Sequence, residues 1–254
     1  MSKRLEGKVI VVSGGTSGVG KAAAYAFAKE GAKVVIGGRK KEKADELIQK
    51  VHEIGGEAIF VYTELEHVAD SKNLIQQAVK AYGKIDGLFC YAGITSISPL
   101  DSCDEDTFNS VMDVNFRANF FCCQETINFM KEHGGSIVLT GSSHAWGGQK
   151  DRAAYACSKG ALLTLMEHIA HNYARNQIRC NYLTLGWTPT EGEINFRKNQ
   201  GENEEHLRKR AAEIIPMGRM LESDDYLEIL IYLMSDDSKM MTGSILRVTG
   251  GEYI

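Results

Sequence analysis

The sequence predicts an α/β fold, a doubly wound parallel sheet of about seven strands with helices on both faces, in one domain spanning residues 1–254. Three observations carry this prediction. Short β-branched runs alternate along the chain with segments of helical periodicity. A glycine-rich turn joins the first run to the first helix. The chain has only three prolines and no Ser/Pro-rich linker. Repeated strand–helix units of this kind form a parallel sheet.

The seven predicted strands are short apolar runs bounded by charge or glycine: Lys8–Val12, Lys33–Ile36, Glu57–Tyr62, Ile85–Cys90, Ser136–Thr140, Ile178–Leu183 and Ser244–Val248. Helices are predicted between them, at 21–30, around 44–54, around 74–79, from about 104 to 133, at 152–175 and at 226–234. Residues 190–213 are rich in Glu, Asn, Lys and Arg. They form either a solvated helical face or a lid beside the active site.

The turn Ser13-Gly-Gly-Thr-Ser-Gly-Val-Gly20 lies between the first strand and the first helix, and a second strand follows within about 30 residues. Glycines let the backbone approach a pyrophosphate, and a helix N-terminus offers unpaired N–H donors at a positive dipole end. This context predicts a dinucleotide-binding Rossmann fold. The alternative is a flexible glycine turn without a ligand.

Composition excludes several classes of protein. The net charge is −4 and the basic residues are dispersed, which argues against a nucleic-acid or anionic-membrane surface. No apolar run approaches the roughly 20 residues that span a bilayer, and the first residues lack an apolar signal region, so we expect a cytoplasmic protein. The six cysteines form no zinc pattern, and no metal is expected.

Tyr155 and Lys159 lie four residues apart in a predicted helix, so their side chains project from the same face. A phenol is a poor acid near neutral pH, because its unperturbed pKa is about 10. A nearby ammonium favours the phenolate and lowers that pKa. The pair can therefore exchange a proton with a carbonyl or alcohol oxygen. On spacing alone, a surface pair without function is the commoner interpretation.

Three further segments stand in register with this pair. Ser142 lies thirteen residues before Tyr155, at the end of a predicted strand, and Asn115 lies in Val114-Asn-Phe-Arg-Ala118. With the Ser13–Gly20 turn, in which the family's T-G-x-x-x-G-x-G pattern appears with serine in place of threonine, the whole chain resembles the short-chain dehydrogenase/reductase family, in its branch of about 250 residues. The resemblance implies hydride transfer between a nicotinamide cofactor and a carbonyl or alcohol carbon.

The resemblance also implies roles for four catalytic residues. Tyr155 acts as the general acid and base, Ser142 hydrogen-bonds the reacting oxygen, and Lys159 lowers the tyrosine pKa and contacts the nicotinamide ribose. Asn115 holds a water that connects Lys159 to solvent. Relatives that reduce enoyl double bonds space Tyr and Lys seven apart, and position 162 here is Leu162, which disfavours that activity.

The cofactor-binding residues implied by the resemblance follow the first, second, third, fourth and sixth strands. They are Ser13, Gly14, Thr16, Ser17, Gly18, Val19, Gly20, Gly38, Arg39, Glu64, Leu65, Ala92, Gly93, Tyr155, Lys159, Gly186, Thr188 and Thr190. The sequence departs from the family pattern at three places. Cys90-Tyr91 replaces Asn-Asn, Glu64 replaces an aspartate, and Leu185 replaces a proline. These departures motivate an alternative function, a cofactor-binding sensor or scaffold without turnover.

Cofactor preference depends on the residues after the second strand. NAD-binding proteins place a carboxylate there for the ribose hydroxyls, whereas this chain has Gly38 and Arg39. A guanidinium can bind a 2′-phosphate with two hydrogen bonds, so NADP(H) is expected over NAD(H). The alternative is that Arg39 is a solvent-exposed loop residue.

Expected substrate-lining residues follow the fourth, fifth and sixth strands: Thr95, Ser96, His144, Trp146, Gln149, Trp187 and Glu191. They favour a small hydroxylated substrate, although His144 can equally be a structural hydrogen-bonding residue and either Trp a packing residue. A homodimer or homotetramer is expected, because the two long helices carry surplus apolar surface: Phe120, Phe121, Cys122, Ile127, Leu163, Met166 and Ile169.

Overall fold

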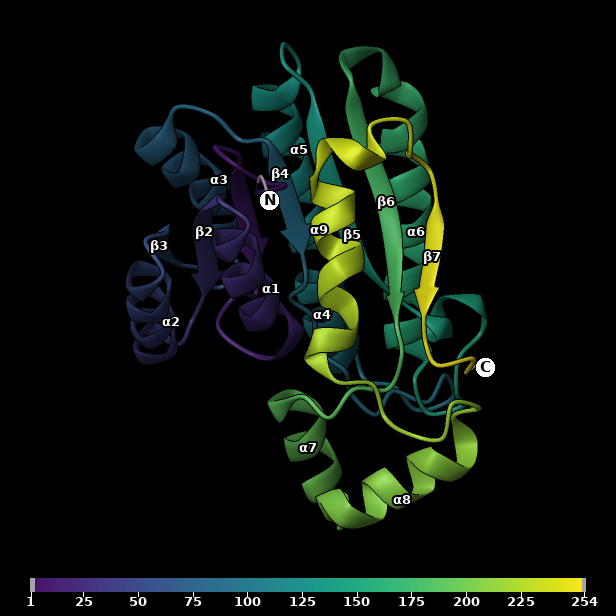
Figure 1. The fold of residues 1–254 in the computed structure, drawn as a ribbon. Helices are drawn as coiled ribbons and strands as arrows, with labels where there is room; N and C mark the ends of the chain where they lie inside the picture. Colours follow the sequence, from purple (N-terminus) through teal and green to yellow (C-terminus); the bar gives the residue numbers. More distant parts are fainter. Residues whose placement is uncertain (1–2, 253–254) are drawn as a thin grey trace.

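A computed structural model describes residues 3–252 (Figure 1). Its centre is a parallel sheet in the order β3-β2-β1-β4-β5-β6-β7. The strands are β1 Val9–Ser13, β2 Lys33–Gly38, β3 Glu57–Tyr62, β4 Gly87–Cys90, β5 Gly135–Ser142, β6 Ile178–Leu185 and β7 Ile245–Val248. The order reverses between β1 and β4, so the crossovers leave a crevice at the carboxyl ends of these strands. The predicted fold class is confirmed.

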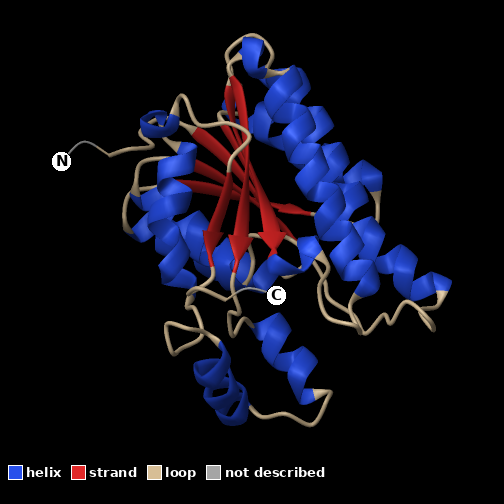
Figure 2. Ribbon diagram, turned by 90° about the vertical axis from the view of Figure 1, so that its right-hand side faces the viewer, coloured by secondary structure: helices blue, strands red, loops and turns tan. Residues whose placement is uncertain are grey.

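Helices cover both faces of the sheet (Figure 2). One face carries α1 (Gly18–Lys29), α2 (Lys41–Glu53) and α9 (Leu227–Met234). The other carries α3 (Val68–Tyr82), α5 (Ala118–Met130) and α6 (Ala153–Asn172), with the short α4 (Glu105–Met112) beside α6. This arrangement places the helix N-termini and the connecting loops at one edge of the sheet.

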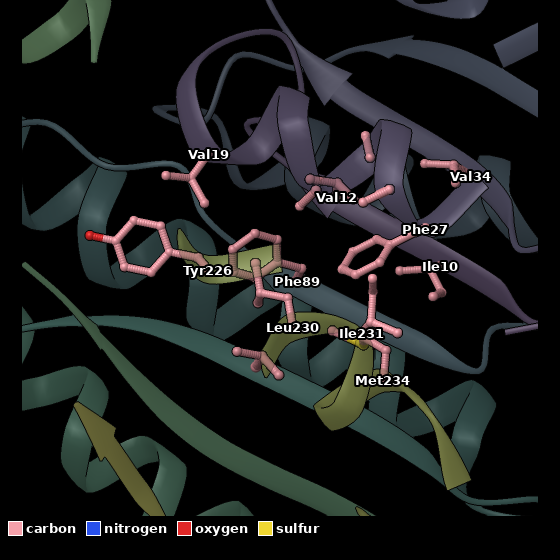
Figure 3. Packing of buried hydrophobic residues seen from close by; sticks show 14 of the residues in the cluster. Ile10, Val12, Val19, Phe27, Val34, Phe89, Tyr226, Leu230, Ile231 and Met234 are labelled. Atoms are coloured by element: carbon pink, nitrogen blue, oxygen red, sulfur yellow. The ribbon is translucent and has the colours of Figure 1, made fainter. Parts of the chain in front are cut away.

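Side-chain alternation along the strands divides the interior into two cores. In β1, Ile10 and Val12 face the core of α1 and α9, whereas Val11 faces the core of α3, α5 and α6. Figure 3 shows the first core, where Phe27 and Phe89 pack beside residues of α9. Strands buried on both faces need continuous apolar runs, which is why the sequence has them.

The predicted helix over 104–133 is interrupted in the structure. A turn of π-helix, Asp113–Arg117, separates α4 from α5. Asn119 donates a side-chain hydrogen bond of 2.7 Å to the Asn115 carbonyl, and the Asn115 side chain leaves the helix to hold the loop after β4. Amides that compete for backbone partners widen the helix here, and π-turns of this kind often occur at functional sites.

Residues 190–213 contain two helices, α7 (Glu191–Lys198) and α8 (Glu204–Ile214), which project beyond the carboxyl ends of the strands (Figure 1). Each begins at a side-chain cap. Thr190 accepts from the Glu193 N–H at 3.3 Å, and Asn203 accepts from the His206 N–H at 2.8 Å. Within the described chain, no helix is both long and apolar enough to cross a membrane.

The expected surplus of apolar surface on the long helices is only partly present. Cys122, Ile127, Met166 and Ile169 are buried in the core of this chain itself, against the sheet. That part of the expectation was wrong, because α5 and α6 use these residues to cover their own sheet face. Phe120 and Phe129 of α5 remain exposed, and so does Phe108 of α4.

Candidate active site

A cleft of about 760 Å³ opens at the carboxyl ends of β1, β2, β4, β5 and β6, beneath α7. It is the place where a doubly wound sheet binds its ligand. The structure brings together in its lining Ser142, Tyr155, Lys159, Ser13, Gly14, Thr16, Ser17, Val19, Gly38, Arg39, Leu65, Ala92, Gly93, Gly186, Thr188, Thr190, Thr95, His144, Gln149, Trp187 and Glu191. One cavity therefore holds residues predicted for cofactor, catalysis and substrate.

Lys159 carries a buried ammonium at the centre of this cleft. Its side chain is 3% exposed, and Nζ donates a 2.9 Å hydrogen bond to the Thr140 carbonyl at the end of β5. Nζ lies 5.6 Å from the centre of the Tyr155 ring. Tyr182 stiffens the junction, because its hydroxyl donates to the Lys159 carbonyl at 3.0 Å and accepts from the Ser142 N–H at 3.3 Å.

Ser142 and Asn115 support the two sides of this pair. The Ser142 hydroxyl oxygen accepts from the His144 N–H at 3.3 Å, so its own proton is available to a partner in the cleft. Asn115 does not line the cleft. Its Oδ1 accepts from the Ile94 N–H at 2.7 Å, and its Nδ2 donates to the Ile94 carbonyl at 2.9 Å and to Ser158 Oγ at 3.0 Å. Asn115 thus fixes the loop after β4 against α6.

Burial moves both ionisable groups away from their ordinary behaviour. Loss of solvation lowers the pKa of Lys159 from 10.5 to about 8. Burial raises the pKa of Tyr155 above 10.0, and the hydrogen bond with Ser142 opposes that rise. The expected net lowering of the Tyr155 pKa is not met in this structure, because loss of solvation is the largest effect. Near neutral pH the site holds a phenol and an ammonium.

The glycine-rich turn is held close to the next strand by Tyr91. A Cβ on Gly18 would lie 2.5 Å from the Tyr91 hydroxyl, and one on Gly20 would lie 2.4 Å from the Gly14 carbonyl. The Tyr91 hydroxyl also hydrogen-bonds the backbone of Val19, and burial raises its pKa to about 12. Tyr91 therefore braces the turn with a phenol where the family pattern has an amide.

The far end of the cleft lies beside β2. Gly38 has no room for a larger residue, because a Cβ there would lie 2.8 Å from the Thr16 side chain. Arg39 is 59% exposed, and its Nη1 is 3.7 Å from Glu66. Lys40 also lines the cleft and is 3.0 Å from Glu191 of α7. Arg39 is therefore a cation without a close ion pair at this end of the cleft.

Several predicted residues lie outside the cleft lining. Gly18 and Gly20 lie under Tyr91, and Ser96 turns its carbonyl toward Arg152. Glu64 hydrogen-bonds Asp70 through its backbone, and its neighbours Thr63 and Leu65 line the cleft instead. Trp146 is 42% exposed and stacks on Arg247 at 4.6 Å, so it packs at the surface and not on a ligand.

Sequence reasoning missed most of the lining that faces the substrate side. The missed residues with charged or aromatic side chains are Arg152, Glu193, Phe196, Arg197, Arg210 and Glu252. Arg152 had a readable signal, since it stands three residues before Tyr155, one helical turn away. The others reach the cleft through the packing of α7, α8 and the C-terminal segment, which no local spacing reveals.

No cluster of three or more His, Cys, Asp or Glu side chains suited to a metal ion occurs between residues 3 and 252. Polar atoms without partners do occur in the cleft. Ser13 Oγ and Thr140 Oγ1 are buried and make no hydrogen bond within the described chain. Such orphaned hydroxyls fit a polar ligand better than an apolar one.

The sheet order and the cleft beside the glycine-rich turn define a Rossmann-type fold, and comparison with known proteins specifies the family. A family model described as "Enoyl-(Acyl carrier protein) reductase" matches residues 14–252. An uncharacterized oxidoreductase of Thermotoga maritima is 33% identical over 247 residues, covering 97% of each chain. The 7alpha-hydroxysteroid dehydrogenase of Clostridium sardiniense is 34% identical over 253 residues, covering 98% of this chain and 94% of that protein.

A crystal structure of a putative short-chain alcohol dehydrogenase from Sinorhizobium meliloti superposes with a TM-score of 0.90 at 26% identity, covering 99% of this chain and 98% of that one. The chain belongs to the short-chain dehydrogenase/reductase family. It is an oxidoreductase of small alcohol or carbonyl compounds, and the family uses a nicotinamide cofactor.

The burial of Lys159 predicts that Lys159→Met stabilises the protein. The fall in pKa from 10.5 to about 8 corresponds to about 3 kcal/mol of unfavourable burial, partly offset by the hydrogen bond to Thr140, about 1 kcal/mol. We expect the midpoint of thermal unfolding at pH 7 to rise by about 3–6 °C.

The pH dependence of this gain has a fixed sign. The penalty is fully present below pH 8, where both folded and unfolded lysine are charged, and it disappears as pH rises from about 8 to 10.5. The gain of Lys159→Met should therefore shrink over that interval. A variant less stable than the parent protein at pH 7, or a gain that grows with pH, would contradict a costly buried ammonium.

Proposed function

We propose that this protein reduces a carbonyl compound with NADPH, or oxidises the corresponding alcohol with NADP⁺, using Tyr155 as the general acid and base. The observation that carries the proposal is the convergence of Ser142, Tyr155 and the buried Lys159 ammonium on one cleft beside the glycine-rich turn. Leu162 is buried and apolar at the position seven residues after Tyr155, which supports carbonyl over enoyl reduction.

In the direction of reduction, Tyr155 gives its proton to the carbonyl oxygen. Its raised pKa keeps the phenol protonated near neutral pH, so the acid is in the correct form before reaction. The Ser142 hydroxyl donates a hydrogen bond to the same oxygen as negative charge develops there. Lys159, charged below pH 8, stabilises the phenolate that remains. Asn115 positions the loop and α6 around this pair.

The residues of the cleft fit a dinucleotide. Ser17 begins α1 without a side-chain cap, and the first turn of α1 contains no acidic residue, so the N-terminus is free for an anion. The glycine-rich turn has no space for Cβ atoms, and Ser13 Oγ lacks a partner. When bound, the nicotinamide supplies or accepts the hydride. The adenosine ribose belongs beside Gly38 and Arg39, where a 2′-phosphate would meet a guanidinium.

We also propose that α7 and α8 form a lid. Glu191, at the start of α7, reaches across the mouth of the cleft to Lys40 and Lys43 beside β2. Trp187, before α7, and Phe196, on α7, line the cleft. Closure of such a lid excludes water from the reacting groups.

The cytoplasmic location stays a prediction from sequence.

Tyr155→Phe tests the chemical assignment. A panel of ketones, aldehydes and sugar acids with NADPH first identifies a substrate by the loss of nicotinamide absorbance. We expect the variant to lose at least about 100-fold in kcat because the proton donor is gone, with NADPH binding retained. Tyr173→Phe, at the end of the same helix and outside the cleft, should keep normal turnover. Near-normal kcat in Tyr155→Phe would refute the assignment, and no turnover of any panel member would favour a sensor.

Cofactor preference is tested at Arg39. One charged hydrogen bond to a 2′-phosphate contributes roughly 1.5–3 kcal/mol, and the exposure of Arg39 favours the lower value, about a tenfold preference for NADPH. Arg39→Gln should reduce the NADPH/NADH ratio of kcat/KM by about that factor. Lys41→Gln removes the same charge from a side chain that is 68% exposed and outside the cleft, and should leave the ratio unchanged. Equal losses in both variants would point to general charge rather than to Arg39.

Glu191→Gln tests the lid. Exposed ion pairs contribute about 0.2–1 kcal/mol, so breaking the contacts with Lys40 and Lys43 should speed NADPH release by up to about fivefold in stopped-flow fluorescence. Glu204→Gln breaks a pair with Arg208 inside the lid and should not change the release rate. If NADPH release is equally fast in the parent protein and in Glu191→Gln, the contacts of Glu191 with Lys40 and Lys43 do not hold the lid closed.

We propose a homodimer or homotetramer that pairs the α4–α5 and α6 faces. Phe108, Phe120 and Phe129 are exposed on α4 and α5, between 36% and 44%. Exposed aromatic side chains on α4 and α5 favour self-association. Sedimentation velocity at micromolar protein should show a dimer or tetramer, and Phe120→Glu should shift it toward monomer. A monomer at tens of micromolar would exclude this assembly.

A further inference from the structure

Arg152 is a buried cation beside the proposed proton donor, with no role in the chemistry described above. It precedes α6 and stands three residues before Tyr155, so the two Cβ positions are about one helical turn apart. Its side chain is 4% exposed, and it lines the cleft together with His144 and Gln149. Arginine is rarely buried to this degree unless a partner is provided.

The backbone of Arg152 is fixed by the loop after β4. Ser98 forms an isolated parallel bridge with Arg152. The Ser98 N–H donates to the Asp151 carbonyl at 2.9 Å, and the Ala153 N–H donates to the Ser98 carbonyl at 2.9 Å. Both peptide groups flanking Arg152 are therefore held, so the backbone from which the guanidinium extends is fixed relative to Tyr155.

The guanidinium packs its flat face on a ring, and the polar contacts that the structure gives it involve Nη1. Its face stacks on the Phe196 ring of α7 at 4.5 Å. Nη1 lies 3.5 Å from the Ser96 carbonyl and 3.3 Å from an oxygen of Asp151, whose side chain is 45% exposed and therefore largely solvated. Among residues 3–252, no carboxylate makes a two-pronged pair with Arg152.

The other two arginines on the substrate side of the cleft are each paired closely with a carboxylate. Arg197 Nε is 2.7 Å from Glu193, and Arg210 Nη1 is 2.6 Å from Glu202. Both stack on Trp187, at 5.3 and 5.0 Å. Glu252 also lines the cleft, and burial raises the pKa of its carboxyl group. On the substrate side of the cleft, Arg152 is therefore the arginine whose only ion pair among the described residues, with Asp151, is to a largely solvated carboxylate.

His144 adds a neutral donor next to this cation. Burial, and then the charge of Arg152, lower the pKa of His144, so the ring is uncharged near neutral pH. Nδ1 accepts from the Gln149 N–H at 3.3 Å, which leaves Nε2 to carry the proton. A guanidinium and an imidazole N–H beside a phenol suit a ligand with anionic oxygen atoms near its reacting carbon.

We propose that the substrate of this site is a short oxo acid or hydroxy acid whose carboxylate binds Arg152. This inference rests on the proposed carbonyl–alcohol chemistry. The carbon of the ketone gains the hydride and its oxygen gains the Tyr155 proton, so the oxo acid is reduced to a hydroxy acid while the nicotinamide is oxidised. The carboxylate undergoes no bond change. A single guanidinium, paired within the described chain only with the half-exposed Asp151, suits a monoanion better than a phosphate dianion.

The test compares acids with uncharged molecules of the same carbon skeleton. We would measure kcat/KM with NADPH for 2-oxobutanoate, 3-oxobutanoate and 4-oxopentanoate, each against its methyl ester. A two-pronged guanidinium–carboxylate contact predicts that at least one acid exceeds its ester by about 10- to 150-fold. The difference should lie mainly in KM, because the contact exists before and after hydride transfer.

Two variants assign that preference to one side chain. Arg152→Gln should collapse the acid/ester ratio to near one, and Arg152→Lys should keep part of it because the charge remains without the forked geometry. Arg208→Gln removes one positive charge from the outer side of α8, where Arg208 pairs with Glu204 and Glu222. Arg208→Gln should leave the acid/ester ratio unchanged. This result would distinguish direct contact with Arg152 from the summed electrostatic effect of positive charges on the lid.

A binding measurement separates this inference from the proposed function. Butanoate and butanamide, which carry no ketone, would be titrated at matched ionic strength into the NADPH-bound protein. Butanoate should bind more tightly than the amide, and Arg152→Gln should remove the difference. If butanoate binds through Arg152 but no compound turns over, the proposed reaction fails and the carboxylate site stands.

Two results would overturn the carboxylate site. Turnover of esters and acids with equal kcat/KM would leave the carbonyl chemistry intact and remove the role of Arg152. An acid preference that persists in Arg152→Gln would do the same. Absence of both turnover and butanoate binding would refute the reaction and the site together.

Discussion

The site depends on one costly interaction, the burial of the Lys159 ammonium between β5 and α6. The ammonium donates a hydrogen bond to the Thr140 carbonyl. The surrounding chain is built to hold that charge in place. Tyr182 joins the Lys159 carbonyl to the Ser142 N–H, and Asn115 joins the loop after β4 to Ser158 of α6. The π-turn at Asp113–Arg117 contains Asn115, the residue that makes these contacts. Local stability is given up where function needs a charge.

The departures from the family pattern have structural explanations. Tyr91 replaces an amide, yet its hydroxyl meets the backbone of Val19 and its ring covers Gly18 and Gly20. Leu185 replaces a proline and packs at the margin of the core of α1 and α9. In these two changes, a polar residue and a rigid residue are replaced by Tyr91 and Leu185, whose side chains pack against the core. They do not disturb the backbone that surrounds the cleft, so they give no structural support to a protein that has lost its catalytic site.

The sheet, the order of its elements and the cleft were predictable because their signals are local. Strand runs, the glycine-rich turn and the spacings that join Ser142, Tyr155 and Lys159 all lie within short windows of sequence. The remainder depended on long-range packing. Trp146 lies outside the cleft because it stacks on Arg247 of β7, about one hundred residues later. Leu65 lines the cleft in place of Glu64, whose N–H donates a hydrogen bond to Asp70. Phe196 and Arg210 reach the cleft only through the fold of α7 and α8. The pKa of Tyr155 depends on burial, which spacing does not report.

The most direct test of this account is the ionisation of Lys159 itself. Protein labelled with ¹³C at lysine Cε would be titrated by NMR, with Lys159→Met used to assign the resonance. The structure predicts one lysine that titrates near pH 8 and is missing from the variant. If the assigned Lys159 resonance instead titrates near 10.5, the ammonium is solvated, and the buried charge on which the proposed proton transfer depends is not present.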